Sequence, residues 1–260
     1  MNKIIPFPIP GSKYRAPPVG RRSPSAAEFE TAAAAFLKRT FPAASFLEVC
    51  NAAIENAFNE RSEKALYKYK YLACMALERY YDASLLAFVM LNRFQDEALH
   101  CEMMCSICLK RNHYDMALEH LDRLIGLSGR FTPEAAELER DKAALKGRIA
   151  MILRFSSESF LSEVGNDNNE TRRRYAGLPL LLTGPARFLL HPDTGTPYFI
   201  FKAEGKTGRV IYGQARKSEI PFIPRFKTGG AISIMGSFLG ADEEKILLQP
   251  CTYIGQAIRI

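Results

Sequence analysis

Residues Gly184–Gly213 have the sequence GPARFLLHPDTGTPYFIFKAEGKTGRVIYG. Two strand-like runs, Arg187–Leu190 and Tyr198–Ala203, flank His191–Pro197, a segment dense in turn-forming residues. A second glycine-rich turn then leads into a third run, Arg209–Tyr212. This succession predicts three strands joined by short connections, as in the meander of a small β-barrel.

The strand pattern continues on both sides of this stretch. The first strand is expected over Leu178–Leu190, with a bend or bulge at Gly184-Pro185. After an irregular segment, Gln214–Lys227, a fourth strand is predicted at Ala231–Leu239 and a fifth at Lys245–Ile254. Five short strands, a bent first strand and a longer insert between the third and fourth resemble the oligonucleotide/oligosaccharide-binding (OB) fold.

The closing sequence adds to this resemblance. FKTGGAISIMGSFLG followed by EKILLQPCTYIG is similar to the anticodon-binding-like branch of the OB fold, where a glycine-initiated strand precedes a last strand that ends near a Cys. The resemblance covers about 80 residues, from about 176 to 256, and it rests on strand order and turn glycines. It implies a barrel that binds nucleic acid or protein.

Upstream, the chain is predicted to be helical from Ser25 onward, because apolar residues recur every three or four positions. The clearest internal repeat is Tyr80-Tyr-Asp-Ala83, which recurs as Tyr114-Asp-Met-Ala117, 34 residues later. Helix–turn–helix units with this period and a Tyr-x-x-Ala start of the second helix resemble tetratricopeptide repeats. The resemblance assigns two units, Lys64–Glu97 and Ala98–Phe131.

The flanking helices, Ser45–Phe58 and Thr132–Leu153, show no clean third copy and are either degenerate repeats or caps. A solenoid of this kind leaves a concave groove that typically takes a peptide. We therefore expect a protein partner at the groove, where the predicted register places Lys68, Leu72, Met75, Glu102, Ser106 and Leu109.

Together these patterns predict a two-domain chain, α then β. Residues 1–24 form a Pro-rich basic arm that is expected to be disordered, 25–155 a helical repeat domain, 156–175 a linker and 176–260 the OB-like barrel. The linker is inferred from the Gly-Asn-Asp-Asn-Asn end of Ser156–Asn169, which is typical of loops.

The composition predicts a bacterial-type cytoplasmic protein without membrane contact. No apolar run approaches the roughly 18 residues that span a bilayer. Prolines interrupt any signal-peptide core near the N-terminus, and the six cysteines are then expected to be free thiols. The net charge of +7 is uneven, with +5 over residues 1–25, −4 over 26–169 and +6 over 170–260. A basic barrel suits a polyanion, although an ordinary solvated surface explains the same excess.

The barrel surface is the candidate nucleic-acid site. If Phe199 and Phe201 fill the core, strand alternation turns Tyr198 and Lys202 outward. Single-stranded nucleic acid needs rings on which bases stack and cations that offset the backbone charge. The predicted contacts are Arg187, Tyr198, Lys202, Arg209, Arg216, Lys217, Arg225 and Lys227. The alternative is a barrel that binds protein, which would make the chain a pure protein–protein adaptor or assembly factor.

No catalytic, metal or cofactor site is expected, so the sequence favours a non-catalytic binding or adaptor protein. Cys101-x-x-x-Cys105-x-x-Cys108 shares its spacing with the cluster motif of radical S-adenosylmethionine enzymes, which leaves an iron–sulfur enzyme as a further alternative. The three cysteines occupy i, i+4 and i+7 of a helical run, and this favours packing as small core hydrophobes.

Other short motifs also have plain structural interpretations. Gly205-Lys-Thr-Gly208 lacks the upstream glycine and the following helix of a phosphate loop, so it is interpreted as a hairpin turn. Asp242-Glu-Glu244 is interpreted as an exposed turn. The four histidines show no zinc-binding spacing and are expected to be structural or exposed: His100, His113, His120 and His191.

Overall fold

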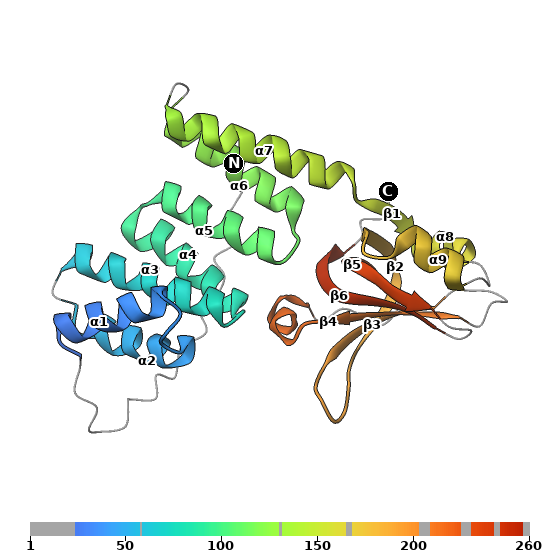
Figure 1. Ribbon diagram of the computed structural model, residues 1–260, viewed down its shortest axis with the longest axis horizontal. Helices are drawn as coiled ribbons and strands as arrows, with labels where there is room; N and C mark the ends of the chain where they lie inside the picture. The colour runs from blue at the N-terminus through green and yellow to red at the C-terminus, as the bar shows by residue number, and fades with distance from the viewer. Residues whose placement is uncertain are drawn as a thin grey trace.

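The computed structural model describes residues 24–57, 59–129, 132–164, 168–202, 209–224, 230–241 and 245–256. A stack of helices is followed by a small closed β-barrel (Figure 1), which confirms the predicted order, α then β. The predictions for the N-terminal arm and for the turns at 205–208 and 242–244 fall outside the described residues.

In the described part, seven helices form the N-terminal region, and each packs on the next along the chain. Side chains cap several of their starts: Ser25 accepts a hydrogen bond from the Glu28 N–H, and Thr132 accepts one from the Ala135 N–H. The predicted start at Thr132 is thus confirmed. The helices are α1 (Ala26–Leu37), α2 (Ala43–Ile54), α3 (Glu60–Ala76), α4 (Tyr80–Phe94), α5 (Glu97–Lys110), α6 (Tyr114–Ser128) and α7 (Pro133–Ala150).

The turns inside the helical hairpins share one geometry. In each turn, three successive N–H groups bond to carbonyls four, three and five residues earlier. The middle residue is left-handed, with φ of 55° at Glu78 between α3 and α4 and 60° at Asn112 between α5 and α6. Arg39, between α1 and α2, has φ 60° and the same pattern of backbone hydrogen bonds. The α1–α2 hairpin therefore has the same turn, although the sequence shows no repeat signature there. Ala83 and Ala117 are both fully buried, as close helix packing requires.

The barrel consists of five strands closed on themselves. Its order is β2-β3-β4-β6-β5, and a further pairing of β2 with β5 completes the circle. Neighbours are antiparallel except β4 and β6, which are parallel. An extra strand, β1 (Leu153–Ser156), pairs in parallel with β2. The five barrel strands are β2 (Pro179–Leu190), β3 (Pro197–Lys202), β4 (Val210–Ala215), β5 (Ala231–Ala241) and β6 (Lys245–Gln256).

The first barrel strand turns the corner between the two halves of the sheet. Residues 179–185 of β2 pair with β5, whereas residues 186–190 pair with β3. The exchange of partners falls at Gly184-Pro185, where the sequence predicts a bend. Gly184 is required there because a Cβ at this position would lie 2.8 Å from the Ser157 Cβ of α8 (Ser157–Glu163).

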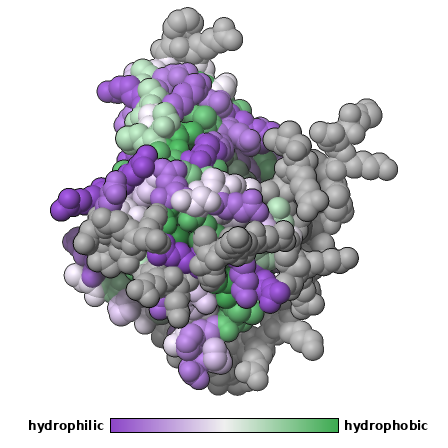
Figure 2. Space-filling model, turned by 90° about the vertical axis from the view of Figure 1, so that its right-hand side faces the viewer, coloured by the Kyte–Doolittle hydropathy of each residue, from purple (hydrophilic) through white to green (hydrophobic). Residues whose placement is uncertain are grey.

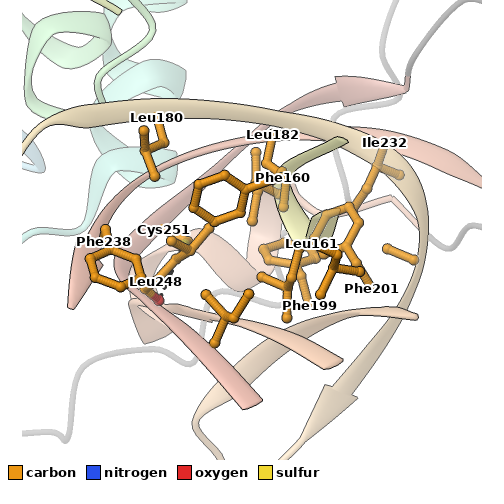
Figure 3. Close-up of a cluster of buried hydrophobic side chains, with 14 of the residues drawn as sticks. Phe160, Leu161, Leu180, Leu182, Phe199, Phe201, Ile232, Phe238, Leu248 and Cys251 are labelled. Atoms are coloured by element: carbon orange, nitrogen blue, oxygen red, sulfur yellow. Dashed lines mark hydrogen bonds between the residues drawn. The ribbon is translucent and has the colours of Figure 1, made fainter. Parts of the chain in front are cut away.

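One end of the barrel is filled by the segment predicted as a linker. Figure 3 shows Phe160 and Leu161 of α8 pointing in among the side chains of the barrel strands. Val164, which follows α8, and Tyr175, the last residue of α9 (Asn168–Tyr175), pack beside them. All four side chains are buried, and together they form the plug of the barrel core. The linker prediction for 156–175 is therefore wrong over the described residues. These apolar groups gain more by covering the open end of the core than by staying in solvent.

Figure 2 views the end of the molecule formed by α8 and α9. Among the coloured residues, hydrophilic side chains predominate and hydrophobic ones show mainly in recesses. No helix in the described part of the chain has the length and apolar character needed to cross a bilayer.

Candidate nucleic-acid interface

One face of the barrel carries the predicted contact residues. Phe199, Phe201 and Ile211 point into the core, so the residues that alternate with them on β3 and β4 point outward. We call these outward residues, with those beside them on β2 and β6, the outer face. The register arranges them in three rows: Leu189–Tyr198–Gln214, Arg187–Ile200–Tyr212–Leu247 and Lys202–Val210–Lys245.

The outer face combines aromatic rings with positive charge. Tyr198 and Tyr212 are half-buried, and they occupy adjacent rows on neighbouring strands. Arg187, Lys202 and Lys245 are exposed around them. None of the three rows contains Asp or Glu. Of the predicted contacts, the structure therefore brings Arg187, Tyr198 and Lys202 together.

Two members of this face were not predicted, Tyr212 and Lys245. The alternation of β4 predicts the outward position of Tyr212, because its neighbours are buried Ile211 and the glycine at 213. Lys245 joins the face because β6 runs parallel to β4 and places it opposite Val210. No sequence pattern predicts the parallel pairing of β4 with β6.

The prediction that Arg209 faces outward is wrong. Its residue is 9% exposed, and its guanidinium Nη1 donates to the Val164 carbonyl oxygen at 3.0 Å. It has the same parity as buried Ile211, so the alternation that exposes Tyr212 turns Arg209 inward. The guanidinium satisfies the carbonyl that ends α8, and its role is structural.

The predicted extension of the site beyond β4 leads to the junction between the domains. Arg216 is exposed and lies 3.8 Å from a carboxylate oxygen of Glu78 in the helical region. Lys217 begins η1 (Lys217–Phe222), which packs against α4 and, in Figure 1, faces the helical stack. Arg225 and Lys227 lie outside the described residues.

A buried ion pair fixes this junction. The Arg111 guanidinium at the end of α5 donates twice to the Glu219 carboxylate of η1, at 3.0 Å each. The Arg111 guanidinium carbon also lies 3.3 Å from the centre of the Phe222 ring. His113 Nε2 donates to the Tyr253 carbonyl oxygen at 2.7 Å and so ties α6 to β6. None of these contacts involves a described residue of the outer face.

The predicted groove residues lie on the first helices of the hairpins. Lys68, Glu102 and Leu109 are exposed, whereas Leu72, Met75 and Ser106 are half-buried. Leu72 and Met75 also pack against the helical core. A hollow of about 500 Å³ opens on this side between α3, α5, α6 and α7, and Lys68 and Glu102 help to line it.

The Cys101, Cys105 and Cys108 thiols lie on the buried side of α5. Burial raises the pKa of Cys105 and of Cys108 to about 11 each, and it raises the pKa of Cys101 as well. A protonated thiol is a poor metal ligand. Among the described residues, no set of three His, Cys, Asp or Glu side chains is arranged to hold a metal ion. This environment favours the packing interpretation of the three cysteines.

No protein-family model and no curated protein sequence matches this chain. The interpretation of the outer face therefore depends on its chemistry, which combines half-buried aromatic rings with exposed cations.

Proposed function

We propose that the chain is a binding adaptor whose barrel contacts single-stranded nucleic acid through the outer face. The observation that supports this most directly is the pair Tyr198 and Tyr212 on a face whose three described rows also hold Arg187, Lys202 and Lys245. Bases stack on exposed rings for about 1–3 kcal/mol each, while the cations offset the phosphate charge. Such contacts confer little sequence preference.

The fold is compatible with this proposal at a finer level of description. The strand order, the bent β2 and the parallel β4–β6 pair agree with an OB-like barrel, and we extend the resemblance to the anticodon-binding-like branch as part of the proposal. The repeated turn and the buried Ala83 and Ala117 similarly support a tetratricopeptide-like assignment for the helical region.

The helical region supplies the second half of the adaptor. It has an open hollow lined by both leucines and charged residues, which is the chemistry expected of a peptide-binding groove. The barrel would thus hold the nucleic acid, and the groove would hold a peptide. The buried Arg111–Glu219 pair keeps the two surfaces in a fixed relative orientation.

Fluorescence anisotropy tests the barrel half. The full chain is titrated into labelled single-stranded oligo(dT) and oligo(U) over a series of salt concentrations. We expect an affinity that falls steeply with salt, and a logarithmic slope reduced by about 0.7 for each phosphate contact removed. Lys202→Ala should reduce this slope, whereas Lys110→Ala, an exposed cation on α5, should leave it unchanged.

Absent binding, or binding that salt does not weaken, would overturn the nucleic-acid proposal. So would binding that Tyr198→Ala and Tyr212→Ala both leave intact. In that event the outer face would be a protein-contact surface, which is the alternative that the sequence also left open.

A further inference from the structure

The hollow of the helical stack has a defined chemistry. Its lining includes three leucines, Leu99, Leu124 and Leu138, which come from α5, α6 and α7. All three are half-buried and form an apolar floor that is still partly open. We call this hollow the acidic groove, because carboxylates line its rim.

The rim is strongly negative. Five carboxylates line the groove, Asp96, Glu102, Glu134, Glu137 and Asp141, and the single cation among the lining residues is Lys68. Asp96 is already paired with Lys64 at 2.6 Å. The remaining four carboxylates are exposed and form no ion pair with another described residue. An apolar floor inside such a rim fits an extended segment with both apolar and basic side chains.

The chain itself contains a segment of this composition. Residues 1–23, MNKIIPFPIPGSKYRAPPVGRRS, carry five basic residues and no acidic one. Their apolar residues are concentrated in Ile4–Ile9, and their cations follow at Lys13, Arg15, Arg21 and Arg22. Five of these residues are prolines, and proline-rich segments in general lose less conformational entropy on binding than flexible ones do. No other stretch of comparable length combines these features.

The arm can reach the groove from its attachment point. Residue 24 lies two positions before Ala26, where α1 begins, and the groove lies on α3, α5, α6 and α7. Six successive helix contacts of about 8–10 Å each put the far end of the stack no more than about 60 Å away. The 14 residues between Ile9 and residue 24 extend to about 50 Å, which is enough for Ile9 to reach α5, four helix contacts or about 40 Å from α1. Ile4, five residues further from residue 24, can extend to about 65 Å and reach α7.

We infer that the N-terminal arm of each molecule occupies its own acidic groove. Ile4–Ile9 would cover the leucine floor, Lys13 would lie on the α5 side of the rim and Lys3 on its α7 side. This inference identifies an occupant for the peptide-binding half of the proposed function, on which it rests. A docked arm reduces the apparent affinity of any other peptide by the fraction of grooves left open.

Zero-length carbodiimide cross-linking of the full chain tests the inference. At low protein concentration and low salt, we expect Lys3 or Lys13 to be joined to Glu102, Glu134, Glu137 or Asp141 in a product of monomer size. High salt should suppress these cross-links, because the contact is mainly electrostatic. Cross-links to Asp115 or Glu119 instead, which are exposed on α6 outside the groove, would overturn the inference. Cross-links confined to a dimer-sized product would do the same.

A second measurement distinguishes failure of the docked-arm inference from failure of the peptide-binding groove itself. A labelled peptide of residues 1–23 is titrated into the full chain and into the Lys13→Glu/Arg15→Glu variant. A docked arm predicts about tenfold tighter peptide binding by the variant, which corresponds to an arm that occupies nine grooves in ten. Equal affinity for both chains would overturn the docked arm alone. If adding Glu134→Gln/Glu137→Gln to the Lys13→Glu/Arg15→Glu variant leaves its affinity for the peptide unchanged, the peptide-binding groove is overturned as well.

Discussion

Arg111 and Glu219 join the two domains through two hydrogen bonds of 3.0 Å, although the residues lie 108 positions apart in the chain. Their side chains are only 7% and 2% exposed. The Phe222 ring covers the guanidinium, and the ring of Tyr81 meets that of Phe222 edge-on at 5.7 Å. A charge pair this deeply desolvated contributes chiefly through what happens when one partner is lost.

We therefore predict that Arg111→Ala lowers the free energy of unfolding by about 3–5 kcal/mol, because it leaves the buried Glu219 carboxylate without its cationic partner. Replacing both partners together, as Arg111→Met/Glu219→Leu, should recover most of that loss. Urea unfolding followed by circular dichroism measures both effects. Arg79→Ala is the matched control, since the Arg79–Asp82 pair is surface-exposed and should contribute less than about 1 kcal/mol. A double variant as unstable as the single one would contradict this account.

His113 predicts a specific loss of stability in mild acid. Burial, aided by the nearby Arg111 charge, lowers its pKa from 6.5 to about 4, against the opposing hydrogen bond to the Tyr253 carbonyl. As the pH falls below 6.5, His113 therefore takes up a proton in the unfolded chain but not in the folded one. The free energy of unfolding is unaffected by this difference above pH 6.5 and decreases as the pH falls toward 4, by up to about 3 kcal/mol.

His113→Gln isolates this effect, because the glutamine amide keeps a donor for the Tyr253 carbonyl and does not titrate. The slope of unfolding free energy against pH between 6.5 and 4 should become smaller in the variant. His120, whose pKa burial also lowers, contributes in the same direction and accounts for part of the remaining slope. An unchanged slope in His113→Gln would show that His113 does not titrate differently in the two states.

The junction illustrates what the sequence could not reveal. The period of 34 residues predicted the hairpins, and strand alternation with turn glycines predicted the barrel strands to within a few residues. Both signals are local. The contact of Arg111 with Glu219 depends on how two finished domains meet, and no local pattern encodes it. The parallel pairing that brings Lys245 beside Val210 is non-local in the same sense.

Two other features have a local signal. Phe160, Leu161 and Val164 have helical spacing, which favours an apolar helix face ahead of the polar Gly-Asn-Asp-Asn-Asn tail. Arg209 shares its parity with Ile211, so strict alternation along β4 already placed Arg209 inside and Tyr212 outside. The charge of Arg209 favours an exposed position, whereas the pleat of the strand turns its side chain inward.

The cysteines are predicted to resist modification in the folded protein. All six are buried, and burial raises the pKa of Cys50 to about 12 and of Cys74 to about 11. The thiolate is the reactive form, so each thiol is both shielded and protonated at neutral pH. Reaction with Ellman's reagent should be slow in the native state and should yield six equivalents after unfolding in guanidinium. Rapid native labelling of Cys101, Cys105 or Cys108 would contradict the burial of this side of α5.

The two tyrosines of the outer face should act together on nucleic acid. Tyr198→Ala and Tyr212→Ala are each expected to weaken binding of a single-stranded oligonucleotide by about 1–3 kcal/mol, or fivefold to 150-fold. The corresponding Phe variants should keep most of the affinity, because stacking needs the ring and not the hydroxyl. Anisotropy titrations at fixed salt measure the effect. Tyr81→Ala, at the domain junction, serves as the aromatic control and should leave oligonucleotide affinity unchanged.

Gly184 tests whether α8 is an integral part of the barrel. A Cβ at this position would lie 2.8 Å from the Ser157 Cβ, and Ser157 is 1% exposed at the start of α8. Gly184→Ala must therefore push α8 away from β2, at a cost of about 1–3 kcal/mol in unfolding free energy. Ser157→Gly in the same chain removes the opposing atom and should restore much of the loss, as a double-mutant cycle would show. Gly126→Ala is the control, since no heavy atom lies within 4 Å of its added Cβ and the change should stabilise α6 by about 1 kcal/mol. If Gly184→Ala proved as harmless as Gly126→Ala, α8 would have to be a loosely attached element rather than the plug of the core.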